Sequence, residues 1–240
     1  MKVIDWKNEI KEEELKEVSD ALIDGKLVIF PTETVYGIGA IATSEDSVSK
    51  IFLAKGRAQD NPLIVHLSST KEIEKYAYIE NDVEKKLIES FMPGPFTLIL
   101  KKKDNIPNNV SGGMDTIGIR IPDNKIANRI LSYNNIAVAA PSANKSGKPS
   151  GTDIKSIYNE FLDSVDYLID GGNTDIGIES TVVRVIKNIP VILRPGFVTK
   201  EDIMNKIGVV QVDDNINKLV TGPVLSPGMK YTHYAPVSKC

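Results

Sequence analysis

The segment LVIFPTETVYG, residues 27–37, joins an apolar run to a polar motif that is edged by proline and glycine. Residues 27–30 predict a buried strand, which Pro31 ends because proline has no backbone N–H to donate within a sheet. Polar motifs bordered by β-rich runs recur at residues 55–66, 116–122, 141–152, 179–184 and 193–196. Rigid scaffolds present their working loops in this way, so the sequence predicts one site assembled from several loops.

The composition is that of an ordinary globular protein, with 41% hydrophobic and 25% charged residues in 240. A net charge of −3 gives no general attraction to nucleic acid or membranes, so anion binding would need local clusters of cations. One cysteine, Cys240, excludes an internal disulfide and fits a reducing compartment. The first residues are strongly charged and no apolar run approaches membrane-spanning length, so we expect a cytoplasmic protein without membrane contact.

Hydrophobic periodicity predicts helices near residues 10–24, 82–90, 123–133, 153–162 and 199–207, and another that begins at the N-cap Ser44. Strands are predicted near residues 27–30, 63–67, 96–102, 116–121, 136–140, 165–170, 180–186 and 190–194. Because strands outnumber helices and some are adjacent, we expect an α/β protein with a twisted mixed β-sheet covered by helices. Residues 1–207 form the predicted domain, and the Pro-containing, weakly periodic residues 208–240 form a predicted linker or arm.

Cationic side chains flank most of the polar motifs: Lys55, Arg57, Arg120, Lys145, Lys148, Arg184 and Arg194. Arginine binds phosphate or carboxylate oxygens with a rigid fork, and lysine adds a point charge. Each of these residues taken alone is equally well explained as a solvated surface residue. Arg120 differs because it lies inside the apolar strand GIRIP, where an unpaired charge is costly, so it needs an anionic partner.

The loop PSANKSGKPSGT, residues 141–152, follows an apolar strand and is rich in hydroxyl, amide and lysine side chains. Its backbone N–H groups, with Thr152 as the expected cap of the next helix, favour an anion site. A plain hydrophilic turn is the alternative, and the loop is not a Walker A motif.

Two other patterns are weaker. Residues 37–42 match a relaxed dinucleotide fingerprint, but the apolar run continues to the Ser44 cap where that fingerprint requires a helix to open. His66 and His233 with Cys240 do not have the spacing of metal ligands, so no metal site is predicted. His66 alone is better explained as a core or rim histidine at the end of an apolar strand.

Taken together, the motifs PTETVYG, KGR with NPL and a histidine, PGPFT, GIRIP, PSAN, EST and RPG resemble, in this order, those of the YrdC-like threonylcarbamoyl-adenylate synthases. The resemblance covers about residues 10–205 and implies the YrdC-like fold around a concave cationic cleft. Residues 226–236 (SPGMKYTHYAP) resemble the linker that precedes a smaller second domain in the longer branch of the family. The expectation is a member of this two-domain branch without its C-terminal domain.

The family's reaction is the formation of L-threonylcarbamoyl-AMP and pyrophosphate from L-threonine, bicarbonate and ATP, for threonylcarbamoyladenosine in tRNA. The resemblance also implies Mg²⁺ bound through the ATP phosphates, a downstream tRNA threonylcarbamoyl-transfer machinery and a weak direct contact with tRNA. Two alternatives stay open: an RNA-binding or translation-associated module, and a carbamoyl-transfer domain of the same fold. The mildly acidic chain, with 6% aromatic residues, argues against the first.

Matching motifs assign site residues. The catalytic set implied by the resemblance is Lys55, Arg57, Ser142 and Asn144. The implied threonine pocket consists of Thr34, His66, Arg120, Ser142 and Ser180, with Arg120 as the clamp for the substrate carboxylate. The implied ATP site consists of Arg57, Asn61, Thr116, Ala140, Ser150 and Arg194, with His233 and Tyr234 of the linker folded over the nucleotide.

Overall fold

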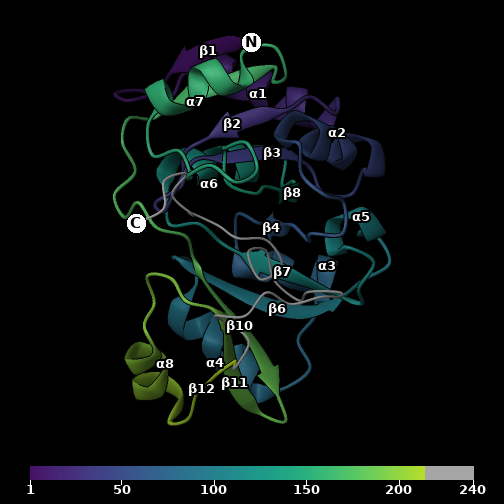
Figure 1. Ribbon diagram of the computed structural model, residues 1–240, viewed down its shortest axis with the longest axis vertical. Coiled ribbons are helices and arrows are strands. Elements are labelled where there is room, and N and C mark those ends of the chain that lie inside the picture. Colours follow the sequence, from purple (N-terminus) through teal and green to yellow (C-terminus); the bar gives the residue numbers. More distant parts are fainter. Residues whose placement is uncertain (214–240) are drawn as a thin grey trace, which may run out of the picture.

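A computed structural model describes residues 1–213 (Figure 1). The predicted site residues His233 and Tyr234, and most of the predicted arm, lie outside the described residues. Within residues 1–213, no helix has both the length and the apolar character that crossing a membrane requires.

The described strands form one 12-stranded mixed sheet in the order β1-β9-β2-β3-β8-β4-β7-β6-β10-β11-β12, with β5 paired to β6 off this path. Their bounds are β1 (Lys2–Asp5), β2 (Val28–Phe30), β3 (Gly37–Ile41), β4 (Ile64–His66), β5 (Ala77–Tyr78), β6 (Phe96–Lys102), β7 (Thr116–Arg120), β8 (Val138–Ala139), β9 (Tyr167–Asp170), β10 (Thr181–Ile186), β11 (Ile189–Arg194) and β12 (Gln211–Val212). The sheet contains parallel pairs such as β4–β7 and β6–β10 and antiparallel pairs such as β2–β3 and β6–β7. The predicted mixed α/β architecture is confirmed.

Helices cover both faces of this sheet, which runs along the long axis of the molecule from β1 to β12 (Figure 1). Their bounds are α1 (Glu12–Ile23), α2 (Glu45–Lys55), the 3₁₀ helix η1 (Thr70–Glu72), α3 (Ile73–Tyr76), α4 (Asp82–Phe91), α5 (Asn108–Ser111), α6 (Lys125–Tyr133), α7 (Ile154–Phe161) and α8 (Lys200–Ile207). Every predicted helix and strand is present, with ends within two residues of the predicted ones. Ser44 is the N-cap of α2, as predicted, because its side chain accepts a hydrogen bond from the backbone N–H of Ser47.

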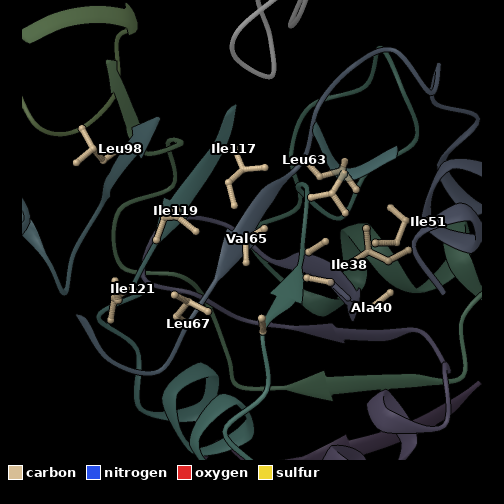
Figure 2. Close-up of a cluster of buried hydrophobic side chains, with 14 of the residues drawn as sticks. Ile38, Ala40, Ile51, Leu63, Val65, Leu67, Leu98, Ile117, Ile119 and Ile121 are labelled. Atoms are coloured by element: carbon tan, nitrogen blue, oxygen red, sulfur yellow. The ribbon is translucent and has the colours of Figure 1, made fainter. Parts of the chain in front are cut away.

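Alternating side chains of the strands divide the core into two layers. Val28 and Phe30 of β2 pack with α1 and α6, whereas Ile29 between them belongs to the larger cluster on the other face. Figure 2 shows part of this larger cluster, where Val65 of β4 and Ile119 of β7 lie among the labelled aliphatic side chains. The two layers hold the strands rigidly, which fixes the loops at the strand ends.

Sequence periodicity missed β3, whose GIGAI sequence contains two glycines. Gly39 is required by packing, since a Cβ there would lie 2.7 Å from both Phe30 Cε1 and Val138 Cγ1. Because β3 is an antiparallel strand beside β2, the chain has no helix where a dinucleotide fingerprint needs one. The structure therefore agrees with the rejection of that motif.

The sheet continues past residue 207, where the sequence placed the end of the domain. Val210 is buried in the larger core cluster, β12 pairs in parallel with β11, and the N–H of Asp213 donates to the carbonyl of Ile192. Residues 208–213 thus belong to the folded sheet, while the boundary of the predicted arm remains a prediction.

Candidate active site

A pocket of about 270 Å³ lies over the middle of the sheet, where loops from neighbouring strands meet. Its walls are Thr32, Val35, Tyr36, Gly37, Arg57, Ile64, His66, Arg120, Ala140, Pro141, Ser142, Glu179, Ser180, Arg194 and Pro195. Every polar motif singled out in the sequence contributes to the wall from a loop or a strand end, and GIRIP does so through Arg120 at the end of β7. Three arginines face one glutamate on these walls, and the cationic character of the cleft as a whole remains a prediction.

Strand register places His66 and Arg120 next to each other. β4 and β7 run parallel, and the last residues of the two strands, His66 and Arg120, are register partners. Carboxyl ends of parallel strands meet at one edge of a sheet, which is where α/β proteins bind ligands. Sequence spacing alone, with more than fifty residues between the two, could not reveal this pairing.

The first motif and the PSAN loop are joined by backbone contacts. Gly37 forms an isolated antiparallel bridge with Ser142, and the N–H of Ala143 donates to the carbonyl of Tyr36 at 2.7 Å. The hydroxyl of Tyr36 donates to the carbonyl of Gly172 at 2.6 Å, which ties a third segment to the same place. These bonds bring residues more than a hundred positions apart to one wall of the pocket.

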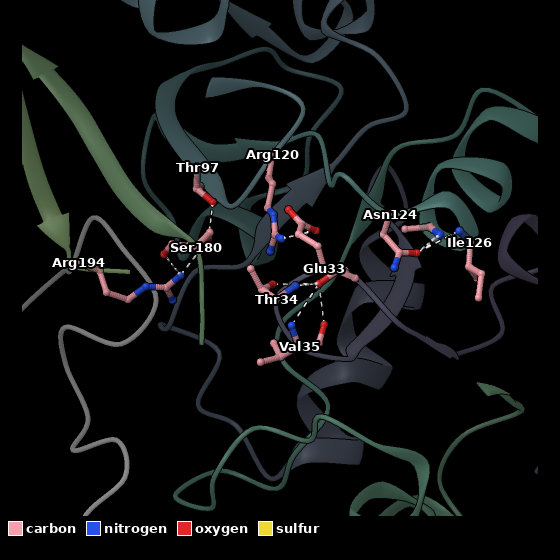
Figure 3. A network of polar contacts seen from close by, with 11 residues as sticks. Glu33, Thr34, Val35, Thr97, Arg120, Asn124, Ile126, Ser180 and Arg194 are labelled. Atoms are coloured by element: carbon pink, nitrogen blue, oxygen red, sulfur yellow. Dashed lines mark hydrogen bonds and ion pairs between the residues drawn. The ribbon is translucent and has the colours of Figure 1, made fainter. Parts of the chain in front are cut away.

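A hydroxyl turn shapes the PTET segment. The Oγ1 of Thr32 donates to the carbonyl of Val35 at 2.7 Å, accepts from the N–H of Thr34 at 3.2 Å, and lies 2.9 Å from Thr34 Oγ1. Thr34 is fully buried, and Thr32, rather than the predicted Thr34, is on the pocket wall. The turn directs the intervening side chain, Glu33, toward Arg120 (Figure 3).

Arg120 does have an anionic partner, and the partner is internal. Its Nη2 lies 2.8 Å from Oε2 of Glu33, with side-chain exposures of only 5% and 6%. Yet neither oxygen of Glu33, nor Nε or Nη2 of Arg120, makes a hydrogen bond of good geometry with any other described residue. Buried polar atoms left in this state are uncommon and indicate a place where a ligand completes the hydrogen bonding.

His66 is a neutral imidazole at physiological pH. Burial, followed by the neighbouring charge of Arg120, lowers the pKa of His66 from 6.5 to about 3. Its Nδ1 lies 3.3 Å from the carbonyl of Ile64, and the residue is 3% exposed. It can therefore take part in hydrogen bonding to a ligand without bringing a charge.

Arg194, Ser180 and Thr97 form a second polar chain, of which Arg194 and Ser180 are on the pocket wall (Figure 3). Arg194 Nη2 donates to the carbonyl of Ser180 at 2.8 Å and to its Oγ at 3.1 Å, and that Oγ lies 2.8 Å from Thr97 Oγ1. Burial lowers the pKa of Arg194 to about 10, so the guanidinium remains charged at neutral pH. The wall thus offers a second guanidinium and an oriented hydroxyl.

Lys55, predicted as catalytic, does not line the pocket. Its ammonium donates to the backbone carbonyls of Ser142 and Asn144, and the side chain is buried. Burial, and after it the charge of Arg57, moves the pKa of Lys55 well below its ordinary value. Asn144 likewise turns into its own loop, where Oδ1 accepts from Ser142 Oγ at 2.6 Å. Both residues shape the loop that presents Ser142.

The predicted nucleotide residues divide into two groups. Arg57, Ala140 and Arg194 are on the pocket wall, whereas Asn61, Thr116 and Ser150 are not among the lining residues. Arg57 is held by its own loop, since Nη2 donates to the carbonyl of Pro62 at 3.0 Å. Ser150 Oγ donates to Oε1 of Glu179 at 2.6 Å, so it orients a residue of the wall.

The expected helix cap at Thr152 is wrong. α7 is capped by Asp153, whose carboxylate accepts from the N–H of Ser156 at 3.0 Å. Aspartate supplies a charged acceptor at the N-terminus of the helix, where its negative charge also interacts favourably with the positive end of the helix dipole. An anionic carboxylate occupies this N-terminus, which argues against a phosphate there.

Sequence reasoning missed Thr32, Glu33, Tyr36 and Glu179 as residues at or beside the pocket. All four lie inside motifs that it did single out, PTETVYG and ESTVVR. The two glutamates could have been found from the sequence. A glutamate in a motif otherwise rich in hydroxyl groups and glycine suggests an ion pair with one of the arginines in the other motifs.

These contacts define the class of protein before any comparison. It is an α/β domain whose central pocket is lined by guanidinium groups and hydroxyls, and none of the described lining residues is an aspartate that could complete a Ser-His-Asp arrangement.

Comparison with known proteins identifies the family. The Sua5/YciO/YrdC family, described as "Telomere recombination", matches residues 20–196. The threonylcarbamoyl-AMP synthase of Pyrococcus abyssi is 41% identical over 234 residues, covering 98% of this chain and 69% of that protein. The Bacillus subtilis enzyme of the same name is 43% identical over 226 residues, covering 94% of this chain and 65% of that protein. The crystal structure of P. abyssi Sua5 complexed with L-threonine superposes with a TM-score of 0.95 at 40% identity, covering 100% of this chain and 70% of that one.

The chain therefore belongs to the Sua5/YciO/YrdC family, and the predicted YrdC-like fold is confirmed. It spans about two thirds of the length of the two curated relatives, 69% of one and 65% of the other.

Proposed function

We propose that this chain is an L-threonylcarbamoyladenylate synthase, which forms L-threonylcarbamoyl-AMP and pyrophosphate from L-threonine, bicarbonate and ATP. The observation that carries the proposal is the buried Arg120 on the pocket wall, with donors that no described residue satisfies well. A buried guanidinium is suited to an amino-acid carboxylate, which it can bind with two charge-assisted hydrogen bonds. Relatives more than 40% identical, named for this activity, support the same conclusion.

The site would act mainly by holding its reactants in place. Arg120, with His66, Ser142 and Ser180, binds the threonine end, while Arg57 and Arg194 take phosphate oxygens of ATP. Carbamates lose carbon dioxide readily in water, so a pocket that encloses the intermediate and aligns its oxygen with the α-phosphate favours adenylation. Lys55 and Asn144 contribute by fixing the loop of Ser142, and Thr34, Asn61, Thr116, Ala140 and Ser150 remain proposed ligand contacts carried over from the family.

Mg²⁺ would enter with ATP. Among residues 1–213, no three or more histidine, cysteine, aspartate or glutamate side chains gather as a metal cage. In the proposed reaction the ion is held by phosphate oxygens of ATP and by water, and it would neutralise phosphate charge during the displacement. Arg57 and Arg194, on the pocket wall, would share that neutralisation.

The setting that follows is tRNA modification in the cytoplasm, with a transfer machinery that consumes the adenylate. The RNA-binding alternative has no support from the described pocket, whose polar groups are mostly buried and suited to a small ligand. The carbamoyl-transfer alternative is less favoured because the relatives that match nearly all of this chain are named as synthases.

One assay tests the proposal. The full chain is incubated with ATP, Mg²⁺ and bicarbonate plus each amino acid in turn, and pyrophosphate and the adenylate are measured. We expect release that depends on threonine and on bicarbonate, with serine poorer by about 1–3 kcal/mol because it lacks one methyl group. Pyrophosphate release that is indifferent to the amino acid would contradict the proposal.

A further inference from the structure

The internal partner of Arg120 has a consequence for ligand choice. Glu33 and Arg120 form a buried pair with no net charge, joined at 2.8 Å. Both carboxylate oxygens of Glu33 lack a well-aligned hydrogen bond within the described residues. Arg120 is on the pocket wall, whereas Glu33 stands directly beside it (Figure 3). Any carboxylate that binds Arg120 therefore arrives next to an existing carboxylate.

Charge counting separates two kinds of ligand. A plain carboxylate on Arg120 would leave two buried negative charges sharing one positive charge, and like charges at short range in a dry site repel strongly. A zwitterionic amino acid carries an ammonium group one carbon away from its carboxylate. That ammonium supplies the missing positive charge, so all four charges are balanced.

Two neighbouring groups on the pocket wall, His66 and Arg194, do not supply this positive charge. His66 is neutral, because burial and the Arg120 charge lower its pKa to about 3. Arg194, the next cation on the wall, is already offset by Glu179, whose charge raises the pKa of that arginine against the effect of burial. The Thr32 and Thr34 hydroxyls are turned toward each other and toward the backbone.

We propose that Glu33 makes the Arg120 pocket selective for zwitterionic amino acids over simple carboxylates, by attracting the α-ammonium group and repelling a ligand that lacks it. This inference rests on the proposed function, because it takes the Arg120 pocket as the threonine site. Glu33 is then a specificity-determining residue, and PTETVYG supplies the charge that distinguishes an amino acid from its deaminated analogue.

The test compares two ligands on three proteins. L-threonine and (3R)-3-hydroxybutyrate, which lacks only the amino group, are titrated calorimetrically into the parent chain, Glu33→Gln and Glu72→Gln. Glu72 is a matched control because it is buried to the same degree as Glu33, contacts Ser68 and Lys75, and does not line the pocket. We expect Glu33→Gln to reduce the preference for threonine over 3-hydroxybutyrate by roughly tenfold or more, and Glu72→Gln to keep it.

Each outcome either supports or overturns the inference. An unchanged ratio of affinities in Glu33→Gln, or an equal loss in Glu72→Gln, overturns the inference while leaving the proposed function standing. A parent chain that binds no threonine and forms no adenylate overturns the proposed function and this inference with it. If Glu33→Gln does not fold, the two ligands are titrated into the parent chain alone. Threonine should then bind at least roughly tenfold more tightly than (3R)-3-hydroxybutyrate, and equal affinities overturn the inference.

Discussion

At the scale of single residues, hydrogen-bond partners distinguish cations that look alike in the sequence. Arg120 and Lys55 are both nearly inaccessible, at 4% and 2% exposure, but their partners differ. Lys55 is committed to two backbone carbonyls, whereas Arg120 faces a single carboxylate with poor hydrogen-bond geometry. Only a cation whose hydrogen bonding is incomplete is well placed to bind a ligand.

Replacement of Arg120 should therefore affect the amino acid more than the nucleotide. We expect Arg120→Ala to weaken threonine binding by about 2 kcal/mol, roughly thirtyfold, because a charge-assisted contact is lost. Arg120→Lys keeps a positive charge beside Glu33 and loses the fork, so it should fold better and still bind threonine less tightly. Calorimetry that finds a larger loss for ATP than for threonine would assign Arg120 to the nucleotide instead.

His66 should make stability depend on pH. Its pKa is 6.5 when unfolded and about 3 when folded, so the unfolded chain binds an extra proton between these values. The contribution of the neutral imidazole is complete above pH 6.5 and is lost as pH falls toward 3, amounting to about 2 kcal/mol by pH 5. Urea unfolding of the parent and of His66→Gln at pH 7 and 5 measures the difference. Equal pH slopes in the two proteins would contradict a buried neutral His66.

At the scale of elements, the working loops are fixed by contacts that cross between elements. α2 ends at Lys55, and Gly56 takes a left-handed conformation with φ of 61°, which turns the chain sharply into Arg57. From this position Lys55 reaches the loop after β8, while Lys145 of that loop donates back to the carbonyl of Ala54. The helix end and the loop thus stabilise each other.

Loss of the Lys55 ammonium should loosen that loop. Lys55→Met leaves two carbonyls, of Ser142 and Asn144, without their donor, at a cost of about 1–3 kcal/mol for each one that stays buried. We expect faster hydrogen exchange in residues 142–148 and lower activity. Lys50→Met is the matched control, because Lys50 lies in the same helix and donates to the carbonyl of Gly25 instead. Equal exchange in the two variants would mean that Lys55 does not hold the loop.

At the scale of the whole molecule, one continuous sheet assembles the pocket. Apart from Arg57, which follows α2, the lining residues lie on or near β2, β3, β8, β4, β7, β10 and β11, which are neighbours in the sheet apart from the intervening β6. β6 takes part through Thr97, which contacts Ser180. Any separation of these strands would therefore dismantle the site.

Substrate binding should consequently stabilise the sheet as a unit. A ligand at a hundred times its Kd adds about 2.7 kcal/mol, which corresponds to roughly 5–10 °C in Tm for a chain of this size. We expect calorimetric scans to show a single unfolding transition for residues 1–213, and ATP, Mg²⁺ and threonine should raise its temperature. Arg120→Lys should lose most of the shift caused by threonine and keep that caused by ATP. A ligand-induced split into two transitions would mean that the pocket belongs to only part of the sheet.

The sequence by itself determined the α/β class, the positions of the long helices and strands, and the family, because periodicity and short motifs are local properties of the chain. It also required an anion beside Arg120, since a buried charge is costly wherever it lies. Only the tertiary structure decided that this anion is Glu33, that Lys55 holds a loop rather than lining the pocket, and that GIGAI is a strand. Those outcomes depend on register and packing between segments far apart in the chain: His66 meets Arg120 because β4 and β7 pair, and Gly39 is needed because Phe30 and Val138 fill the space beside it.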